Sequence, residues 1–300
     1  MADQPLILVT GATGAQGGSV ARHLLAQGQF RVRALTRNPA HPKAEALRQA
    51  GAEVAAGNLD DPASLHAAMQ GCYGVFGVTN FWEAFEKELD LGKNLIDAVA
   101  ASNIQHFVFS SLPHVYAMTG GELKVPHFDI KAKLAEYAVK CGIPMTQVHV
   151  AFYYENFLSY FPPRKQSDGT YTFGFPQGDT NLSAVSVADM GGVVAPIFAD
   201  RERFLGRTVG IVGDDAPPTR YAQILSKVLH KPVAYHHIPR EVFAGFGFPG
   251  ADDLANMFDF NRRYILSRQA DLDESKRLYP AMQSFASWAE ANRTALEGVL

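Results

Sequence analysis

Three regularly spaced glycines are the first residues with a clear chemical use. Gly11, Gly14 and Gly17 follow the apolar run Leu6–Val9, which has the length and branching of a buried strand. From Ser19 onward the apolar residues recur at helical spacing. A strand, a glycine turn and a helix in this order point backbone N–H groups and the positive end of the helix dipole at one spot. The segment therefore predicts a phosphate-binding loop.

The spacing within this loop is GxxGxxG, which differs from the GxGxxG of ordinary dinucleotide-binding folds. Glycines can also gather in a loop simply to make a tight turn. The strand and the helix on either side favour phosphate binding over that simpler explanation. The residues between the glycines that we assign to the phosphate site are Thr13, Ala15 and Gln16.

Arg37 stands just after a second strand-like run, Phe30–Leu35. In a dinucleotide site an acidic residue at this point bonds the ribose 2′-hydroxyl, whereas an arginine accommodates a 2′-phosphate. The forked donors of a guanidinium suit a phosphate group. We therefore expect the cofactor NADP(H), bound in preference to NAD(H). The simpler alternative is that Arg37 is a solvated surface residue.

Polar residues also follow the next three strand-like runs. The carboxyl ends of parallel strands meet at one edge of a sheet, and cofactors sit outside that edge. We therefore expect these polar residues to join the glycine loop and Arg37 at a common rim. They are Asn58, Thr79, Asn80, Ser110 and Ser111, and Thr10 is expected at the same rim. In the loop after the third run, we expect either Asn58 or Asp60 to face the adenine. Asp61, directly before a proline, is instead typical of a helix N-cap.

Strand-like and helical segments alternate from residue 6 to residue 150. This alternation predicts an α/β fold, a doubly wound parallel Rossmann-type sheet with right-handed crossovers. One amphipathic helix is expected to run unbroken over residues 83–102. We expect two domains, with 1–151 binding NADP(H). Residues 152–300 would form a smaller, irregular α+β subdomain for a substrate or partner, and the chain is free to cross back between the two.

Composition narrows the class of protein. A chain of 300 residues with 47% hydrophobic residues is long enough for one large or two modest cores. A formal net charge of −3 gives no electrostatic basis for direct nucleic-acid binding. We find no signal-peptide pattern, no apolar stretch of membrane-span length and no Cys/His cluster with metal spacing. We therefore expect a cytoplasmic protein, with the nucleus as a second compartment, no membrane association and no metal.

Several blocks of the sequence resemble the NmrA-like family of atypical short-chain dehydrogenase/reductase-fold proteins. The blocks are GATGAQGGSVARHLL, TRNP, HFDIK, GIPMT, YYENF and GFPGADDLANMF. The likeness runs over nearly the whole chain and is closest to the NmrA-like redox-sensor branch. It implies an NADP(H) site in which Arg37 binds the 2′-phosphate. It also implies that Lys131 matches the family's active-site lysine and that Tyr153 to Asn156 match a loop near the nicotinamide.

The candidate catalytic residues depart from the usual pattern. Short-chain dehydrogenases use Tyr-x-x-x-Lys, in which the tyrosine is the acid/base and the lysine holds the ribose and lowers the tyrosine pKa. Here this spacing gives His127 and Lys131. His127 can donate a proton near neutral pH, or it can cap or pack at a helix start. Lys131 can serve as the acid/base, as the likeness to isoflavone-type reductases suggests, or bond ribose hydroxyls without chemistry. Tyr116 and Tyr153 are other candidate acids.

Two functions are compatible with these residues. The resemblance and the missing tyrosine favour a sensor that reads the NADPH/NADP balance and binds a regulatory protein partner. Lys131, His127 and an aromatic-rich outer region favour an NADPH-dependent reductase of a quinone, enone or carbonyl small molecule. The aromatic residues of this region are Phe152, Tyr153, Tyr154, Phe157, Phe246 and Phe248, and such residues are more often ordinary core than the lining of a pocket. A dinucleotide fold with a dead site is a third, weaker interpretation, and a homodimer is one option for assembly.

Overall fold

The computed structural model describes residues 4–300 and divides the chain into two compact units. The first unit holds the chain up to His114, His127–Val150 and Ala188–Val209, and the second holds Val115–Pro126, Ala151–Val187 and Gly210–Leu300. One change of unit, after Val150, lies beside the predicted boundary between 1–151 and 152–300. The chain also crosses back, because residues 115–126 group with the second unit and residues 188–209 with the first.

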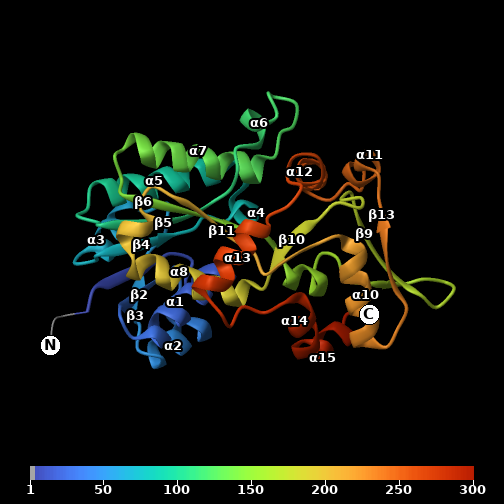
Figure 1. Ribbon diagram of the computed structural model, residues 1–300. Helices are drawn as coiled ribbons and strands as arrows, with labels where there is room; N and C mark the ends of the chain where they lie inside the picture. Colours follow the sequence, from blue (N-terminus) through green and yellow to red (C-terminus); the bar gives the residue numbers. More distant parts are fainter. Residues whose placement is uncertain (1–3) are drawn as a thin grey trace. The chain divides into compact units, whose positions relative to one another are not determined.

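The first unit is built on a parallel sheet (Figure 1). Its strands lie in the order β11-β6-β5-β4-β1-β2-β3, and every pair from β6 to β3 is parallel. They are β1 (Leu6–Val9), β2 (Arg31–Thr36), β3 (Glu53–Ala56), β4 (Gly74–Gly77), β5 (His106–Ser111), β6 (Met145–Val150) and β11 (Thr208–Ile211), of which the last two residues of β11 are counted with the second unit. The central strands β1, β4 and β5 are buried along their whole length, as expected for strands covered on both faces. The predicted doubly wound parallel sheet is confirmed.

Helices cover both faces of this sheet, and Figure 1 shows α5 and α7 on one face and α1 and α2 on the other. The helices are α1 (Ala15–Gln27), α2 (Pro42–Gln49), α3 (Pro62–Met69), α4 (Phe81–Ala84), α5 (Glu88–Ala100), α7 (Pro126–Lys140), α8 (Met190–Ala199) and α9 (Arg201–Phe204). A short 3-10 turn, η1 (Phe85–Lys87), precedes α5. A Cβ atom added at Gly92 would lie 2.2 Å from Leu134 Cδ1. Glycine at this position therefore allows α5 to pack closely against α7.

The predicted unbroken helix over 83–102 is wrong. Phe85 has a φ of 43°, a left-handed conformation that an α-helix does not contain. The segment therefore divides into α4, η1 and α5. The rings of Phe81 and Phe85 pack with their centroids 5.3 Å apart across this break. The break separates Glu83, which is exposed, from Glu88, which is buried as the first residue of α5.

The second unit combines two small sheets with helices, which confirms the predicted irregular α+β subdomain. One sheet has the order β12-β10-β7 and the other has the order β13-β9-β8. The strands are β7 (Phe152–Tyr153), β8 (Arg164–Lys165), β9 (Tyr171–Phe175), β10 (Leu182–Val185), β12 (Asp214–Ala216) and β13 (Val233–His237). The helices are α6 (Val115–Met118), α10 (Pro218–Leu229), α11 (Arg240–Ala244), α12 (Ala251–Tyr264), α13 (Gln269–Leu278), α14 (Phe285–Ala291) and α15 (Arg293–Glu297), and two 3-10 turns are η2 (Tyr154–Leu158) and η3 (Val187–Asp189).

Aromatic side chains form much of the core of the second unit. Tyr154 and Phe157 are completely buried, and each ring packs against Phe285 with the centroids 5.1 Å apart. These two residues of the aromatic-rich region are therefore core. Phe246 and Phe248 are exposed, with 51% and 40% of their surfaces accessible.

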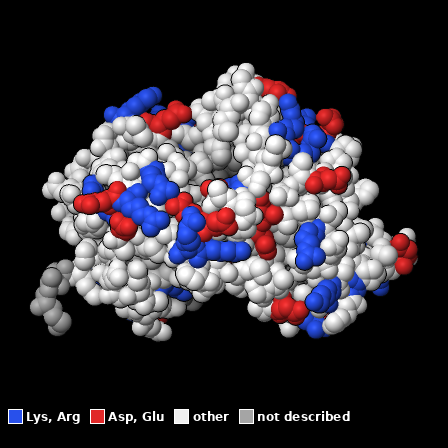
Figure 2. Space-filling model, viewed as in Figure 1, with Lys and Arg blue, Asp and Glu red and all other residues white. Residues whose placement is uncertain are grey.

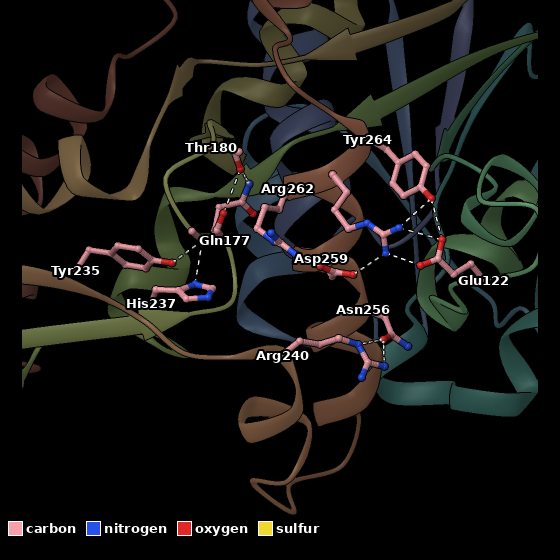
Figure 3. Close-up of polar contacts among 12 residues, drawn as sticks. Glu122, Gln177, Thr180, Tyr235, His237, Arg240, Asn256, Asp259, Arg262 and Tyr264 are labelled. Atoms are coloured by element: carbon pink, nitrogen blue, oxygen red, sulfur yellow. Dashed lines mark hydrogen bonds and ion pairs between the residues drawn. The ribbon is translucent and has the colours of Figure 1, made fainter.

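Polar contacts hold helix α12 within the second unit (Figure 3). This helix contains DDLANMF, the second part of the block GFPGADDLANMF. Arg263 forms an ion pair of 2.6 Å with Glu122, a residue of the segment that follows α6. Asn256 accepts a hydrogen bond of 2.8 Å from Arg240 of α11. Asp259 pairs with Arg263 at 3.2 Å within the helix. Helix α12 therefore has a structural role in the second unit.

Candidate functional site

The glycine loop lies between β1 and α1, and its three glycines meet three different needs. Gly11 has a φ of +58°, which only glycine adopts readily. The N–H of Gly14 donates to the carbonyl oxygen of Gly11 at 2.8 Å and closes the turn. A Cβ atom at Gly17 would lie 2.4 Å from the carbonyl oxygens of Gly11 and Thr10. Gly17 therefore lets α1 begin directly against the end of β1.

The start of α1 is open. Gly14 is its N-cap residue and supplies no side-chain cap, whereas α3 is capped by Asp61, which accepts hydrogen bonds from the N–H groups of Ala63 and Ser64. The predicted N-cap role of Asp61 is thereby confirmed. The first backbone N–H groups of any α-helix have no partner within the helix. At α1 these groups follow the exposed residues Gly14 and Ala15, so the loop fits a phosphate group.

Arg37 follows the last residue of β2 and donates to Glu83 Oε2 at 3.1 Å. Both side chains are exposed, with 69% and 59% of their surfaces accessible. Exposed ion pairs contribute about 0–1 kcal/mol to stability. The guanidinium can therefore exchange this carboxylate for another anion at low cost. The sequence identified Arg37 but missed its partner Glu83.

Asn58 and Asp60 follow β3 in the loop that leads into α3. The backbone carbonyl of Asn58 accepts from the N–H of Asp61 at 3.1 Å, and its N–H donates to the hydroxyl of Ser64 at the same distance. The backbone of Asn58 thus belongs to the cap of α3. Its side chain is half-buried and that of Asp60 is exposed.

The serines after β5 tie the sheet to two helices. Ser110 Oγ donates to Gln16 Oε1 at 2.7 Å and connects β5 with the first turn of α1. Ser111 Oγ donates to the backbone carbonyl of Lys131 at 3.2 Å and connects β5 with α7. Asn80 is exposed and is the N-cap residue of α4. The structure therefore brings Gln16, Ser110 and Lys131 to the same end of the sheet.

Lys131 lies beside the end of β4 and is held by two residues. Its Nζ donates to the backbone oxygen of Thr79 at 2.8 Å and to Thr79 Oγ1 at 2.9 Å. It also forms an ion pair with Glu88 Oε1. Thr79 Oγ1 donates to the same Glu88 oxygen at 2.5 Å. An ammonium group has three N–H donors, and here all three have an acceptor in the protein.

Burial governs the charge of Lys131. The Glu88 side chain is completely buried and only 10% of the Lys131 side chain is accessible. Burial lowers the pKa of Lys131 below its usual value, and the Glu88 carboxylate opposes this effect by attraction and by its hydrogen bond. The opposing carboxylate is what the sequence-based reasoning missed.

A signal for Glu88 was present in the sequence. Glu88, Gly92, Leu95, Ile96 and Val99 are spaced as one face of a helix, and all five are buried in α5. Four of these residues are apolar and the fifth is a carboxylate. A carboxylate on the buried face of a helix requires a cation or several hydrogen-bond donors. This requirement could have pointed to Lys131.

His127 lies in the first turn of α7 and packs among aromatic rings. It is 8% exposed, and its ring centroid is 5.2 Å from that of Trp82, 6.0 Å from that of Phe81 and 4.7 Å from that of Phe128. These contacts agree with the second role expected for His127, which is to pack at the start of a helix. The tyrosine position of the short-chain dehydrogenase pattern is thus filled by a histidine embedded in aromatic side chains.

The remaining candidates belong to the second unit. Tyr153 is in β7 and Asn156 is in η2, and both are half-buried. Tyr116 is in α6 and 45% of its surface is accessible. The candidate residues assigned to the cofactor therefore come from both units, with the glycine loop, Arg37 and Lys131 in the first.

Within residues 4–300, no group of three or more His, Cys, Asp or Glu side chains is arranged to hold a metal ion. None of the helices in the described part of the chain is long and apolar enough to cross a membrane. On the face shown in Figure 2, acidic and basic side chains are interspersed.

Comparison with known proteins places this geometry in a family. Residues 3–289 match the model of the NmrA-like family. The chain is 33% identical over 305 residues to the NmrA-like family domain-containing oxidoreductase FrzB of Cladobotryum sp, with 91% of this chain and 90% of that protein covered.

Solved structures share the fold. The crystal structure of NmrA, a negative transcriptional regulator, in complex with NADP has a TM-score of 0.81 at 23% identity and covers 96% of this chain and 95% of its own. The NADPH-dependent quinone oxidoreductase QOR2 of Escherichia coli, complexed with NADPH, has a TM-score of 0.78 at 24% identity and covers 95% of this chain and 99% of its own. At these identities the likeness shows the fold alone.

Proposed function

Because the chain belongs to the NmrA-like family, we propose that it binds NADP(H) in preference to NAD(H) and responds to the NADPH/NADP balance as a redox sensor. The observation that carries this proposal is the open glycine loop at the start of α1, with Arg37 at the end of the neighbouring strand β2. The loop offers backbone N–H groups to a pyrophosphate, and Arg37 offers a guanidinium to a 2′-phosphate.

The relatives support a nicotinamide dinucleotide at this loop. NmrA has been solved in complex with NAD and in complex with NADP, and QOR2 with NADPH. Arg37 supports the preference for the phosphorylated cofactor, because the pair with Glu83 is exposed and weak. A 2′-phosphate carries more charge than the Glu83 carboxylate and accepts bidentate hydrogen bonds from arginine.

Two features favour sensing over turnover. His127, in the tyrosine position, packs among aromatic rings. Each N–H donor of Lys131 already has an acceptor in Thr79 or Glu88. A sensor needs only different affinities for the cofactor in two conformations of the protein. We propose a regulatory protein as the partner, in line with the description of NmrA as a negative transcriptional regulator.

A second candidate is an NADPH-dependent reductase of a quinone, enone or carbonyl compound. The specific observation in its favour is the buried, charge-paired Lys131 at the rim of the sheet. The names of FrzB and QOR2 as oxidoreductases point the same way. In this reaction NADPH would supply the hydride. Lys131 would donate the proton from Nζ to the substrate oxygen and regain one from solvent.

Binding and turnover can be separated on one sample of the purified protein. NADPH oxidation is followed by absorbance with a panel of quinones, enones and aldehydes, and NADPH and NADP are titrated by calorimetry. The sensor proposal expects both nucleotides to bind, with unequal affinities, and no oxidation. Oxidation that Lys131→Ala abolishes would establish the reductase. Failure of either nucleotide to bind would overturn both.

A further inference from the structure

Lys131 and Glu88 form a buried ion pair at the carboxyl end of β4. Thr79 follows this strand and contacts both partners through its side-chain oxygen, 2.9 Å from Lys131 Nζ and 2.5 Å from Glu88 Oε1. The other carboxylate oxygen, Glu88 Oε2, is buried and has no hydrogen-bond partner among the described residues. One oxygen of Glu88 therefore carries both contacts, and Lys131 is the cation that balances this carboxylate.

Stability alone does not account for such a pair. Replacing a buried ion pair by apolar residues of similar volume is often neutral or stabilising, because removing two charges from water is costly. One turn further along both helices the contact between α5 and α7 is apolar, since Gly92 lies against the completely buried Leu134. The stability of the fold therefore does not by itself explain two buried charges at this place.

A lysine alone at this position would tend to lose its proton, because burial disfavours the charged form. Glu88 acts against that tendency, and Thr79 fixes the ammonium through two further acceptors. We propose that Glu88 is a positioning residue that keeps Lys131 charged and directed at the end of β4. A ligand oxygen at the rim would then accept a hydrogen bond from Nζ in place of one of the two Thr79 oxygens. The inference rests on the proposed function only for the identity of that ligand, an oxygen of the cofactor ribose or of a substrate carbonyl.

Other titratable groups lie on α7 and α5. On α7 itself, Asp129 and His127 precede Lys131 and are both buried. From β5 and from the segment after β4, the contacts are made by the neutral residues Ser111 and Thr79. Further along α5, Asp97 accepts a hydrogen bond from Tyr137 at the surface. Among these elements Glu88 is the carboxylate in direct contact with Lys131.

The test is to titrate Lys131 in the full-length, cofactor-free protein. Lysine side chains are labelled with ¹³C at Cε, and the signal of Lys131 is assigned by its loss in Lys131→Arg. In the wild-type protein the Lys131 signal is expected to be that of an ammonium group at pH 7.5. In Glu88→Gln the pKa of Lys131 is expected to fall by about one to three units, the usual effect of one adjacent opposite charge.

Glu86→Gln is the matched control, because it removes the same charge two residues away from an exposed position. It should leave the Lys131 titration unchanged. An equal pKa for Lys131 in the wild type and in Glu88→Gln would overturn the proposal. If Glu88→Gln does not fold, the wild-type titration decides, since a neutral Lys131 at pH 7.5 would contradict the role given to Glu88.

A second measurement connects the pair to the ligand. The dissociation constant of NADPH is measured from pH 6 to pH 9 for the wild type and Glu88→Gln. The variant should lose affinity at a lower pH than the wild type, in step with its Lys131 titration. Affinities that change with pH alike in the two proteins would restrict Glu88 to a structural role. Absence of NADPH binding in the wild type would overturn the proposed function and leave the Lys131 titration standing.

Discussion

Two ion pairs at the same rim differ in burial. Glu83 and Glu88 both come from the segment between β4 and the start of α5, five positions apart in the sequence. Glu83 pairs with Arg37, and both side chains are more than half exposed. Glu88 pairs with Lys131 and is completely buried. The left-handed conformation at Phe85, between the two glutamates, breaks the helix and allows one to face solvent and the other to face the core.

Burial decides what each pair can do. The exposed pair gains little from its attraction, since water and salt screen it. Its arginine is therefore free to exchange partners, which suits recognition of a phosphate. The buried pair has lost its hydration and can be broken only at high cost. Its lysine is therefore held in one place by Glu88 and Thr79, which suits a fixed positive charge at the rim.

Removing one member of the buried pair should change the free energy of unfolding more than any other substitution predicted here. Glu88→Ala leaves the Lys131 ammonium without its counter-charge, and it should lower the free energy of unfolding by about 3–5 kcal/mol. Urea unfolding at pH 7 measures this. The parallel variant Glu83→Ala should change the same quantity by about 0–1 kcal/mol. Equal losses in the two variants would remove the distinction between the pairs.

His106 can be compared with Lys131, because both are buried. The partner of His106 is a hydroxyl group rather than a carboxylate. His106 Nε2 lies 2.8 Å from Thr146 Oγ1. Burial, with a smaller effect of Arg201, lowers the pKa of His106 from 6.5 to about 4. The folded protein therefore resists protonation that the unfolded chain accepts.

Neutral His106 therefore makes its full contribution to the free energy of unfolding above pH 6.5, and this contribution is lost as the pH falls toward 4. Its contribution should decrease by about 2 kcal/mol between pH 7 and pH 5. Urea unfolding of the wild type and of His106→Gln at the two pH values measures it. The wild type should lose more stability on acidification than the variant, and equal losses would contradict the lowered pKa.

The exposed pair should affect the affinity for the cofactor rather than the stability of the fold. Arg37→Ala should weaken NADPH binding by about 1.5–3 kcal/mol, the value of a hydrogen bond to a charged group, and leave NADH binding nearly unchanged. Calorimetry with both nucleotides measures this. Arg48→Ala is the control, since Arg48 is also an exposed arginine paired with a glutamate. A similar loss for NADPH and NADH in Arg37→Ala would exclude Arg37 from recognition of the 2′-phosphate.

The smallest change in NADPH affinity is expected on removing the charge of Glu83, because this carboxylate competes with the 2′-phosphate for Arg37. Glu83→Gln removes the charge that Arg37 must give up, and it should strengthen NADPH binding by about 0–1 kcal/mol. The gain should shrink at high salt, because exposed charges are screened. Glu45→Gln, which removes an exposed partner of Arg48, serves as control. Weaker NADPH binding in Glu83→Gln would mean that Glu83 holds Arg37 in place for the cofactor.

The local features of this site were predictable and the long-range ones were not. The glycine loop, the position of Arg37 and the cap at Asp61 depend on residues close together in sequence, so their spacing reveals them. Glu88 and Lys131 are 43 positions apart, and their contact depends on how α5 and α7 lie on the sheet. The break at Phe85 was missed because the residues around it favour a helix, whereas packing of Phe81 and Phe85 accompanies the left-handed turn.

We propose above all that the exposed guanidinium of Arg37 gives the site its preference for the phosphorylated cofactor. The most direct measurement is calorimetric titration of the wild-type protein with NADPH and with NADH in the same buffer at moderate salt. NADPH is expected to bind about 10-fold to 100-fold more tightly than NADH, which corresponds to the hydrogen bonds of one charged group. Equal dissociation constants for NADPH and NADH would contradict it.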